Sequence, residues 1–171
     1  MVYRRRPFLK SHGTGLPPWN FREIGKGVIF ETGVLCFHAE NISLGDEIYI
    51  GHYSIIKGYY RQQMVIGSGS WIGQNAFLHS AGGLFIGNDV GIGPGVQILT
   101  SAHDFQSTKH LPILKRPVIF AEVAIGNGCD IGANAVILPG VKLGENIQVG
   151  AGAVVTKSFP DNAVIKGIPA K

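Results

Sequence analysis

The sequence predicts an all-β solenoid in which short parallel strands stack coil upon coil. The first observation is a period of six, at which an aliphatic residue, often followed by glycine, returns. The second is glycine itself, which supplies 25 of 171 residues, about twice its average usage of ~7%. The third is that a period of six fits neither a helix of 3.6 residues per turn nor a long alternating strand. Short strands joined by tight corners account for all three.

The period is unbroken in the C-terminal half of the chain. The first and fifth places of each repeat carry aliphatic or small residues, so both can face a core, and glycine, asparagine and aspartate relieve the steric limits at the corners. Three such sides would close one coil, and stacked coils would bury an apolar stripe. The first places are Ile125, Ile131, Ile137, Leu143, Val149 and Val155, and the fifth places are Cys129, Ala135, Val141, Ile147 and Ala153.

Earlier copies of the repeat are looser and change phase. We expect each phase slip to mark an outward loop or a bulge. Glycine-rich sandwich strands are the alternative, but a sandwich does not enforce a six-residue phase. One run passes through Ile66, Ile72 and Leu78 and then slips by two residues to Ile86, Ile92 and Ile98, and looser copies pass through Ile24, Phe30, Cys36 and Ile42, with Leu44 and Ile50 in the slipped phase.

Two segments leave the period. Residues 1–23 carry three consecutive arginines, two prolines and the aromatic residues Trp19 and Phe21, which predicts an irregular N-terminal arm or cap. Residues 24–171 then form the β-helix domain. Inside that domain, residues 100–117 (TSAHDFQSTKHLPILKRP) interrupt the repeat with polar residues and prolines. A long excursion from a regular stack is a candidate for function.

Composition narrows the functional classes. Hydrophobic residues make up 45% of the chain and the net charge is only +4, so we expect neither disorder nor a nucleic-acid partner. No apolar run reaches the ~18 residues of a membrane span, and no apolar segment of a secretory signal follows the basic N-terminus, so a cytoplasmic protein without membrane insertion is expected. Cys36 and Cys129 are too few for a disulfide scaffold or a cysteine-rich zinc site, and we expect no metal.

Residues 24–171 resemble the hexapeptide-repeat acyltransferases, left-handed parallel β-helix enzymes that include galactoside, maltose and xenobiotic acetyltransferases and bacterial surface-polysaccharide O-acetyltransferases. The resemblance is strongest in IGNDVGIGPGVQILTSAHDF, from Ile86 to Phe105, and in the tail from Ile131 to Lys171. The Thr-x-x-His loop, followed by Gly-Ala-Gly, Val-Thr-Lys and Gly-x-Pro-Ala-Lys, is typical of the acyl-CoA-dependent branch. The resemblance implies the left-handed coil, acetyl-CoA as cosubstrate, and a homotrimer that binds coenzyme A in a groove between neighbouring subunits.

His103 is similar to the catalytic histidine of this family. Moving an acetyl group from a thioester to a hydroxyl needs a base that removes the hydroxyl proton, and an imidazole pKa of ~6.5 suits that work near neutrality. Asn75, in IGQNAF, matches an asparagine that contacts the acceptor, although a turn-forming role is the alternative. Asp104 is a candidate for substrate binding or for orienting His103, as is Glu122, and the alternative for both is a solvated carboxylate.

The resemblance also implies a set of coenzyme A contacts in the C-terminal third. Small residues let the pantetheine arm approach backbone amides and carbonyls in a narrow groove. Lysines offer point charges to phosphates, with an ordinary solvated charge as the alternative. The matching positions are Ala133, Ala151, Thr156, Lys157 and Lys171.

Together these features predict an acetyl-CoA-dependent O-acetyltransferase that acts on a sugar or saccharide, in bacterial surface-glycan biosynthesis, by direct transfer in a ternary complex. Three alternatives stay open: an N-acetyltransferase of an amino sugar or antibiotic, a metalloenzyme similar to γ-class carbonic anhydrases, and a non-catalytic β-helix scaffold. The metalloenzymes bind zinc through three histidines, two of them in a His-x4-His pair, whereas His103 and His110 are seven residues apart. An acyl-cysteine route is disfavoured because Cys129 falls at an inward place.

Overall fold

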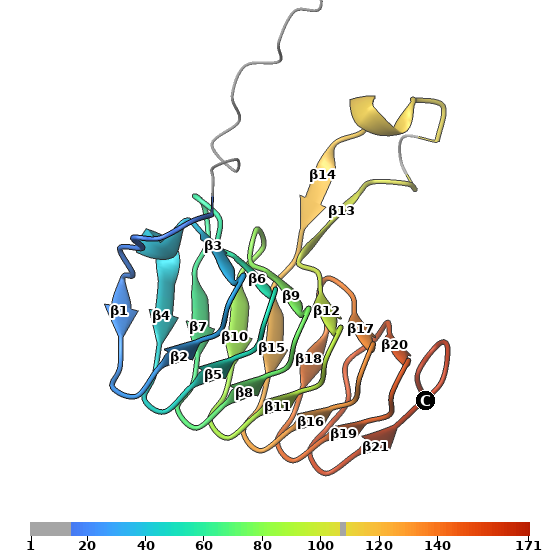
Figure 1. The fold of residues 1–171 in the computed structure, drawn as a ribbon. Helices are drawn as coiled ribbons and strands as arrows, with labels where there is room; N and C mark the ends of the chain where they lie inside the picture. Colours follow the sequence, from blue (N-terminus) through green and yellow to red (C-terminus); the bar gives the residue numbers. More distant parts are fainter. Residues whose placement is uncertain (1–14, 107–108) are drawn as a thin grey trace, which may run out of the picture.

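The computed structural model describes residues 15–106 and 109–171. The backbone there winds into a parallel β-helix whose coils stack along a single axis (Figure 1). A full coil contributes one short strand to each of three sheets, and each strand pairs in parallel with its counterparts in the neighbouring coils. The solenoid predicted from the six-residue period is confirmed. Residues 1–14 of the expected arm and residues 107–108 of the expected loop lie outside the described residues.

The three sheets are named A, B and C in chain order, and the corners between them AB, BC and CA. Sheet A contains β1 (Glu23–Ile24), β4 (Ile42–Leu44), β7 (Met64–Ile66), β10 (Leu84–Ile86), β15 (Val123–Ile125) and β18 (Lys142–Leu143). Sheet B contains β2 (Ile29–Phe30), β5 (Tyr49–Ile50), β8 (Trp71–Ile72), β11 (Gly91–Ile92), β16 (Asp130–Ile131), β19 (Gln148–Val149) and β21 (Val164–Ile165). Sheet C contains β3 (Leu35–Phe37), β6 (Ile55–Lys57), β9 (Phe77–His79), β12 (Gln97–Ile98), β17 (Val136–Ile137) and β20 (Val154–Val155).

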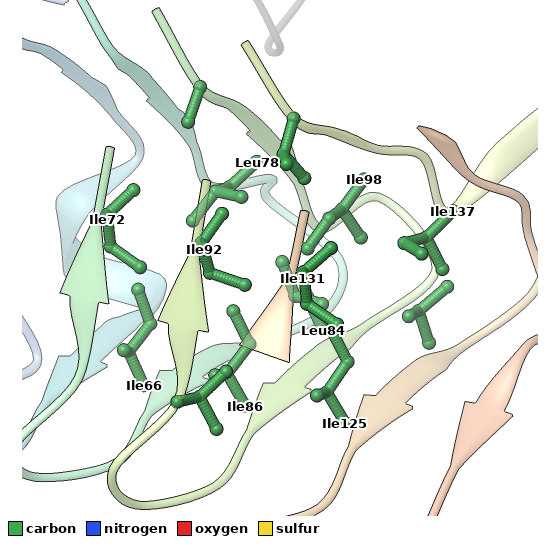
Figure 2. Close-up of a cluster of buried hydrophobic side chains, with 14 of the residues drawn as sticks. Ile66, Ile72, Leu78, Leu84, Ile86, Ile92, Ile98, Ile125, Ile131 and Ile137 are labelled. Carbon is green, nitrogen blue, oxygen red and sulfur yellow. The ribbon is translucent and has the colours of Figure 1, made fainter. Parts of the chain in front are cut away.

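The core is a set of aliphatic columns that run along the axis. In sheet B, Ile72 pairs with Ile92 and Ile92 with Ile131, and all three side chains are fully buried. Figure 2 shows this column with the equivalent columns of sheets A and C pointing into the same interior. Parallel strands lie about 4.8 Å apart, so each inward side chain touches its counterparts one coil above and one below. The repeat phase therefore fixes which face of every strand is buried.

The corners are built from residues that tolerate left-handed backbone. Asn75 and Asn134 both lie at the BC corner with φ of 57°, a region that asparagine enters more readily than most residues. Each corner also bonds to the coil beside it, as the backbone N–H of Asn134 donates to the Pro94 carbonyl at 2.9 Å. The phase slips of the sequence coincide with longer CA corners, which include the 3-10 helix η1 (Ala39–Asn41) and residues 58–63 and 80–83.

One CA corner grows into a long hairpin between β12 and β15 (Figure 1). Its arms are β13 (Ser101–His103) and β14 (Val118–Phe120), which pair antiparallel, and the 3-10 helix η2 (Ile113–Lys115) lies between them. The excursion thus extends beyond the 100–117 expected from the sequence. Val118–Phe120 has the apolar character of a coil strand, but its partner is β13 rather than a strand of the next coil.

The described part of the N-terminal arm caps the first coil. The ring centroids of Trp19 and Phe30 lie 5.0 Å apart, and Phe21 stacks on Phe30 at 5.5 Å. The Trp19 indole N–H donates to the Gly15 carbonyl at 3.0 Å. The terminal repeat of a solenoid has no neighbour to cover its apolar end, and this aromatic cluster does so here.

Candidate active site

His103 is the last residue of the first hairpin arm, and its side chain is exposed. Its Nδ1 atom lies 3.3 Å from the backbone carbonyl oxygen of Arg116, which is on the opposite arm. A carbonyl oxygen accepts hydrogen bonds only, so we assign the proton to Nδ1, which leaves the lone pair of Nε2 directed away from the hairpin backbone. An imidazole held in this tautomer can accept a proton from a bound hydroxyl.

The Arg116 side chain braces the far part of the same hairpin. Its Nε donates to the Leu111 carbonyl at 2.8 Å and its Nη2 to the Lys109 carbonyl at 3.0 Å. The guanidinium also lies 4.6 Å from the centre of the Phe105 ring, a cation–π contact. The residue whose carbonyl orients His103 is therefore itself held by three contacts. The sequence does not indicate this role, because a backbone acceptor carries no side-chain signature.

The two carboxylates that could have oriented His103 make other contacts. The Asp104 Oδ1 atom accepts the backbone N–H of Gln106 at 2.9 Å, which shapes the turn that follows the histidine. Glu122 lies at the hairpin base, where its Oε1 is 3.8 Å from the Lys142 ammonium nitrogen. The contact to His103 Nδ1 comes from the Arg116 carbonyl, so a peptide oxygen lies against this ring nitrogen.

Three of the predicted binding residues line the BC corner. Asn75, Ala133 and Ala151 occupy this corner in three different coils, and Gly152 N–H donates to the Ala133 carbonyl at 2.8 Å. The corner is narrow because a Cβ atom on Gly132 would lie 2.5 Å from the Ala151 nitrogen. Ala133 and Ala151 thus form a small-residue strip along one edge of sheet C. Asn75 lies further down the same edge, with the left-handed backbone that a turn requires.

Lys171 joins this edge from the C-terminal turn. Its backbone N–H and carbonyl both pair with Lys166 at 3.1 Å, and Ala170 N–H donates to the Val154 carbonyl at 2.9 Å. Lys166 in turn follows β21, whose Ile165 carbonyl accepts the Gly150 N–H. The two lysines therefore lie just beyond Ala151 on the same side of the solenoid, and both side chains are exposed.

Thr156 and Lys157 lie at the other edge of sheet C. They follow β20 at the CA corner, on the side from which the hairpin leaves, and both are exposed. The Lys157 ammonium lies 5.4 Å from the centre of the Phe159 ring. The five residues expected to contact coenzyme A are therefore divided between two edges of the sheet.

Within one chain, sheet C separates His103 from the BC edge. Leu138, which lies next to the root of the hairpin, is five steps along the chain from Ala133. At ~3.3 Å per strand residue this is at most roughly 16 Å, because the corner residues are less extended than a strand. A catalytic base and a donor site would have to be far closer than that for direct transfer. One protomer thus carries both halves of the predicted site without bringing them together.

An aromatic cluster at the hairpin root was not predicted. Tyr59 lies 6.1 Å from the His79 ring and 6.3 Å from Phe120 in β14. The Arg61 guanidinium lies 5.0 Å from the centre of the Phe120 ring. Burial, together with the nearby positive charge of Lys57, lowers the pKa of His79 to about 4. His79 is therefore neutral at pH 7 and packs between coil and hairpin.

Neither cysteine has the properties of a nucleophile. Burial raises the pKa of the Cys36 thiol to about 12, and burial also raises the pKa of Cys129. Cys129 Sγ donates to the Gly144 carbonyl at 3.1 Å. Thiols act as nucleophiles when ionised, so both are structural.

Residues 15–106 and 109–171 contain no group of three or more histidine, cysteine, aspartate or glutamate side chains placed to hold a metal ion. No helix in this described part of the chain has the length and apolar character needed to cross a bilayer.

The sequence and fold of this chain are similar to those of known proteins. A model of the hexapeptide repeat of succinyl-transferase matches residues 122–157, which run from β15 past β20. Nodulation protein L of Rhizobium meliloti is 33% identical over 151 residues, which are 87% of this chain and 68% of that protein. The chain belongs to the hexapeptide-repeat acyltransferase family. A galactoside O-acetyltransferase of Lactococcus lactis is 36% identical over 104 residues, 60% of this chain and 48% of that protein.

Solved structures agree with this membership. A variant of AntD, an N-acyltransferase from Bacillus cereus in complex with dTDP and coenzyme A, superposes with a TM-score of 0.79 at 25% identity, over 88% of this chain and 82% of that one. The chain spans between 40% and 65% of the length of seven curated relatives that it matches.

Proposed function

We propose that this chain is an acetyl-CoA-dependent O-acetyltransferase whose acceptor is a hydroxyl of a saccharide. The observation that carries the proposal is the contact between His103 Nδ1 and the Arg116 carbonyl, which supports a ring orientation with Nε2 free to accept a proton. The similarity to a galactoside O-acetyltransferase supports a saccharide acceptor. The complex of AntD with coenzyme A supports a coenzyme A thioester as donor.

In this mechanism His103 Nε2 accepts the proton of the acceptor hydroxyl. The oxygen attacks the thioester carbonyl carbon, and a backbone N–H or polar side chain stabilises the oxyanion of the tetrahedral intermediate. When the intermediate collapses, the carbon–sulfur bond breaks and the proton passes from the imidazolium to the departing sulfur. The products are an acetyl ester and coenzyme A, and no covalent enzyme intermediate is formed.

The donor is assigned to the BC edge. Ala133 and Ala151 leave room for the pantetheine arm to bond with backbone groups, and Lys171 provides positive charge toward the phosphates. Thr156 and Lys157, at the CA edge, would face the donor from a second subunit. Asn75 and Asp104 are assigned to the acceptor.

A homotrimer would unite the two halves of the site. The width of sheet C between the hairpin root and the Ala133 strip supports a site completed by a neighbouring subunit, in which the hairpin of one chain reaches the BC edge of the next. We place this enzyme in the cytoplasm, where acetyl-CoA is available, and assign it to the acetylation of bacterial surface-glycan units.

Subunit mixing tests the shared site directly. The variants His103→Ala and Ala133→Trp are each expected to lose most activity, the second because the indole fills the donor strip. Refolded mixtures of the two should regain activity, since some interfaces then pair an intact hairpin with an intact donor edge. Mixtures that stay as inactive as the parents would refute a shared site, and sedimentation of the wild type as a monomer would refute the trimer. Wild-type release of coenzyme A with no saccharide of a broad panel acetylated would refute the acceptor class.

An amine acceptor is the second candidate, favoured by the likeness to the N-acyltransferase AntD. A product ester is cleaved by mild base, whereas an amide is not. Treating the acetylated product with dilute hydroxide and measuring its mass separates the two reactions.

A further inference from the structure

The backbone conformation and surroundings of Gly91 do not require a glycine at this position. Among the 24 glycines of the described chain, the others either have a positive φ or lie so close to neighbouring atoms that a Cβ atom would clash. A Cβ atom on Gly91 would meet only Asp130 Oδ1, at an ordinary contact distance of 3.6 Å. Glycine within a strand weakens the strand and often marks a place where another molecule approaches closely. The missing side chain therefore leaves usable space.

That space lies on the outer face of sheet B, and we call it the Gly91 notch. Gly91 in β11 pairs with Trp71 in β8 on one side and with Asp130 in β16 on the other. The inward residues of the same three strands, Ile72, Ile92 and Ile131, point into the core (Figure 2), so residues 71, 91 and 130 face outward. The strands of Trp71 and Asp130 are two spacings, or ~9.6 Å, apart. No side chain stands between these two strands at Gly91.

The two walls of the notch differ in chemistry. Tyr49 stacks on Trp71 with ring centroids 5.6 Å apart and planes within 6°, so one indole face is covered and the other turns toward Gly91. Trp71 is 42% exposed. On the opposite wall Asp130 is exposed, and neither its carboxylate nor the Trp71 indole N–H has a hydrogen-bond partner within residues 15–106 and 109–171. The free face of the Trp71 indole is thus separated from the Asp130 carboxylate, which can only accept hydrogen bonds, by the strand of Gly91.

We propose that the Gly91 notch binds one pyranose ring of the saccharide acceptor. The axial C–H groups of a pyranose carry partial positive charge and fit the negative face of the indole. Its hydroxyls donate hydrogen bonds, which the Asp130 carboxylate accepts as charge-assisted bonds. One ring thus satisfies both walls at once.

Other occupants fit less well. An apolar side chain from a second protein copy would cover the indole but leave the Asp130 carboxylate desolvated and without a partner. A nucleotide could stack its base on Trp71, but its phosphates would add negative charge close to Asp130. A neutral or amino-substituted pyranose has neither disadvantage.

The inference rests on the proposed saccharide acceptor and assigns it a surface. Trp71 and Asn75 belong to the same coil, with only the turn at Gly73 and Gln74 between β8 and Asn75. The notch is therefore continuous with the BC edge that carries Ala133. A ring in the notch would lie beside the strip formed by Ala133 and Ala151. The absence of a side chain at Gly91 would then determine how large a sugar unit can enter.

Two indole signals allow a direct test in the full-length protein. The chain has two tryptophans, and Trp19 is an internal control because its N–H is bonded to Gly15 in the N-terminal cap. In a protein labelled with ¹⁵N-tryptophan, titration with methyl β-galactoside and with maltotriose should shift the Trp71 Nε1–H signal and leave that of Trp19 in place. The Trp71→Phe variant assigns the signals.

The Gly91→Val variant puts a side chain in the notch and should fold normally, since its Cβ atom meets only an ordinary contact and valine is favoured in strands. We expect it to weaken saccharide binding at least tenfold with an unchanged melting temperature, and Asp130→Asn to weaken binding several-fold. Gln148→Val, on the next strand of the same outer face, is the matched control and should bind as the wild type does. Absence of a Trp71 shift with both saccharides, or an undiminished shift in Gly91→Val, would overturn the proposal. So would a stronger response to adenosine, or a change of oligomeric state in Gly91→Val.

Activity data separate this inference from the proposed function. If the wild type acetylates a saccharide and Gly91→Val keeps the same KM for it, the notch assignment fails and the function stands. If Trp71 responds to saccharide but the wild type transfers acetyl to none, the function fails and the binding site stands.

Discussion

The Nδ1 atom of His103 and the backbone carbonyl of Arg116 lie 3.3 Å apart, on opposite arms of one hairpin. This contact selects the tautomer in which Nε2 is free to accept a proton. The carbonyl keeps its place through the Arg116 side chain, which bonds to Leu111 and Lys109 further along the hairpin. The orientation of the His103 ring therefore depends on contacts made further along the hairpin.

The first prediction concerns His103. His103→Ala should lower kcat by about 10²–10⁴, the usual contribution of a positioned general base. Acetyl-CoA affinity, measured by calorimetry, and the melting temperature should stay nearly unchanged because the side chain is exposed. His110→Ala, an exposed histidine of the same hairpin, is the control and should retain full activity. Turnover of His103→Ala above about half of the wild-type value, with chemistry rate-limiting, would reject His103 as the base.

The second prediction concerns the donor lysines. Lys171→Ala, and to a smaller extent Lys157→Ala, should raise the Kd of acetyl-CoA several-fold, since exposed charge pairs contribute only ~0–1 kcal/mol. Wild-type affinity should also fall as ionic strength rises. Lys142→Ala, whose ammonium pairs with Glu122, is a control for loss of one surface charge. A double variant that keeps wild-type affinity and has no salt dependence would contradict phosphate binding by these lysines.

The third prediction tests the phase of the repeat. Ile131 is fully buried between Ile92 and Val149, so Ile131→Ala should lower the free energy of unfolding by about 2–5 kcal/mol. Ile131→Asp should be worse, because an unpaired carboxylate would enter the core. Gln148→Ala, on the outer face, should change stability by less than about 0.5 kcal/mol. Equal denaturation midpoints for the three variants would show that the assigned phase is wrong.

A fourth prediction follows from the lowered pKa of His79. Between pH 6.5 and about 4 the unfolded chain binds a proton on this histidine that the folded chain does not, so the free energy of unfolding falls as the pH falls through this window. The His79→Phe variant preserves an aromatic ring beside Tyr59 and removes the titration. The melting temperature of the wild type should therefore drop more between pH 7 and pH 4.5 than that of His79→Phe.

Replacing the exposed His110 by phenylalanine controls for the substitution itself. Parallel curves for wild type and His79→Phe would show that His79 has the same pKa in both states.

The sequence was sufficient to predict the inward faces of the coils. Ile125, Ile131 and Ile137 follow the six-residue phase, and all three lie in the core. Each coil buries the same positions of the repeat, so the six-residue pattern of the sequence predicts which side chains pack in the core. The hairpin end was harder to predict, because the apolar run at Ile119 has the same composition whether it pairs with a coil strand or with β13.

The candidate site was predictable only in part. Motifs single out His103, but its partner is a peptide oxygen that any residue at position 116 would supply. The sequence likewise does not show which glycines the backbone requires. Gly93 is needed because a Cβ atom would lie 2.6 Å from the Ala133 nitrogen, while Gly91, two residues earlier, meets no such constraint. Only the positions of neighbouring atoms distinguish a glycine required by the backbone from one that leaves space for a ligand.

Because whole coils stack, groups on different coils are spaced along the axis in multiples of one strand spacing. Two strand spacings separate β12, which leads into the hairpin, from β20, which leads to Lys157. The axial offset between the groups that we assign to catalysis and to phosphate binding can thus change only in steps of about 4.8 Å. Inserting or deleting a complete coil would change the length of donor that fits between these two assigned groups. The local geometry around each group would stay the same.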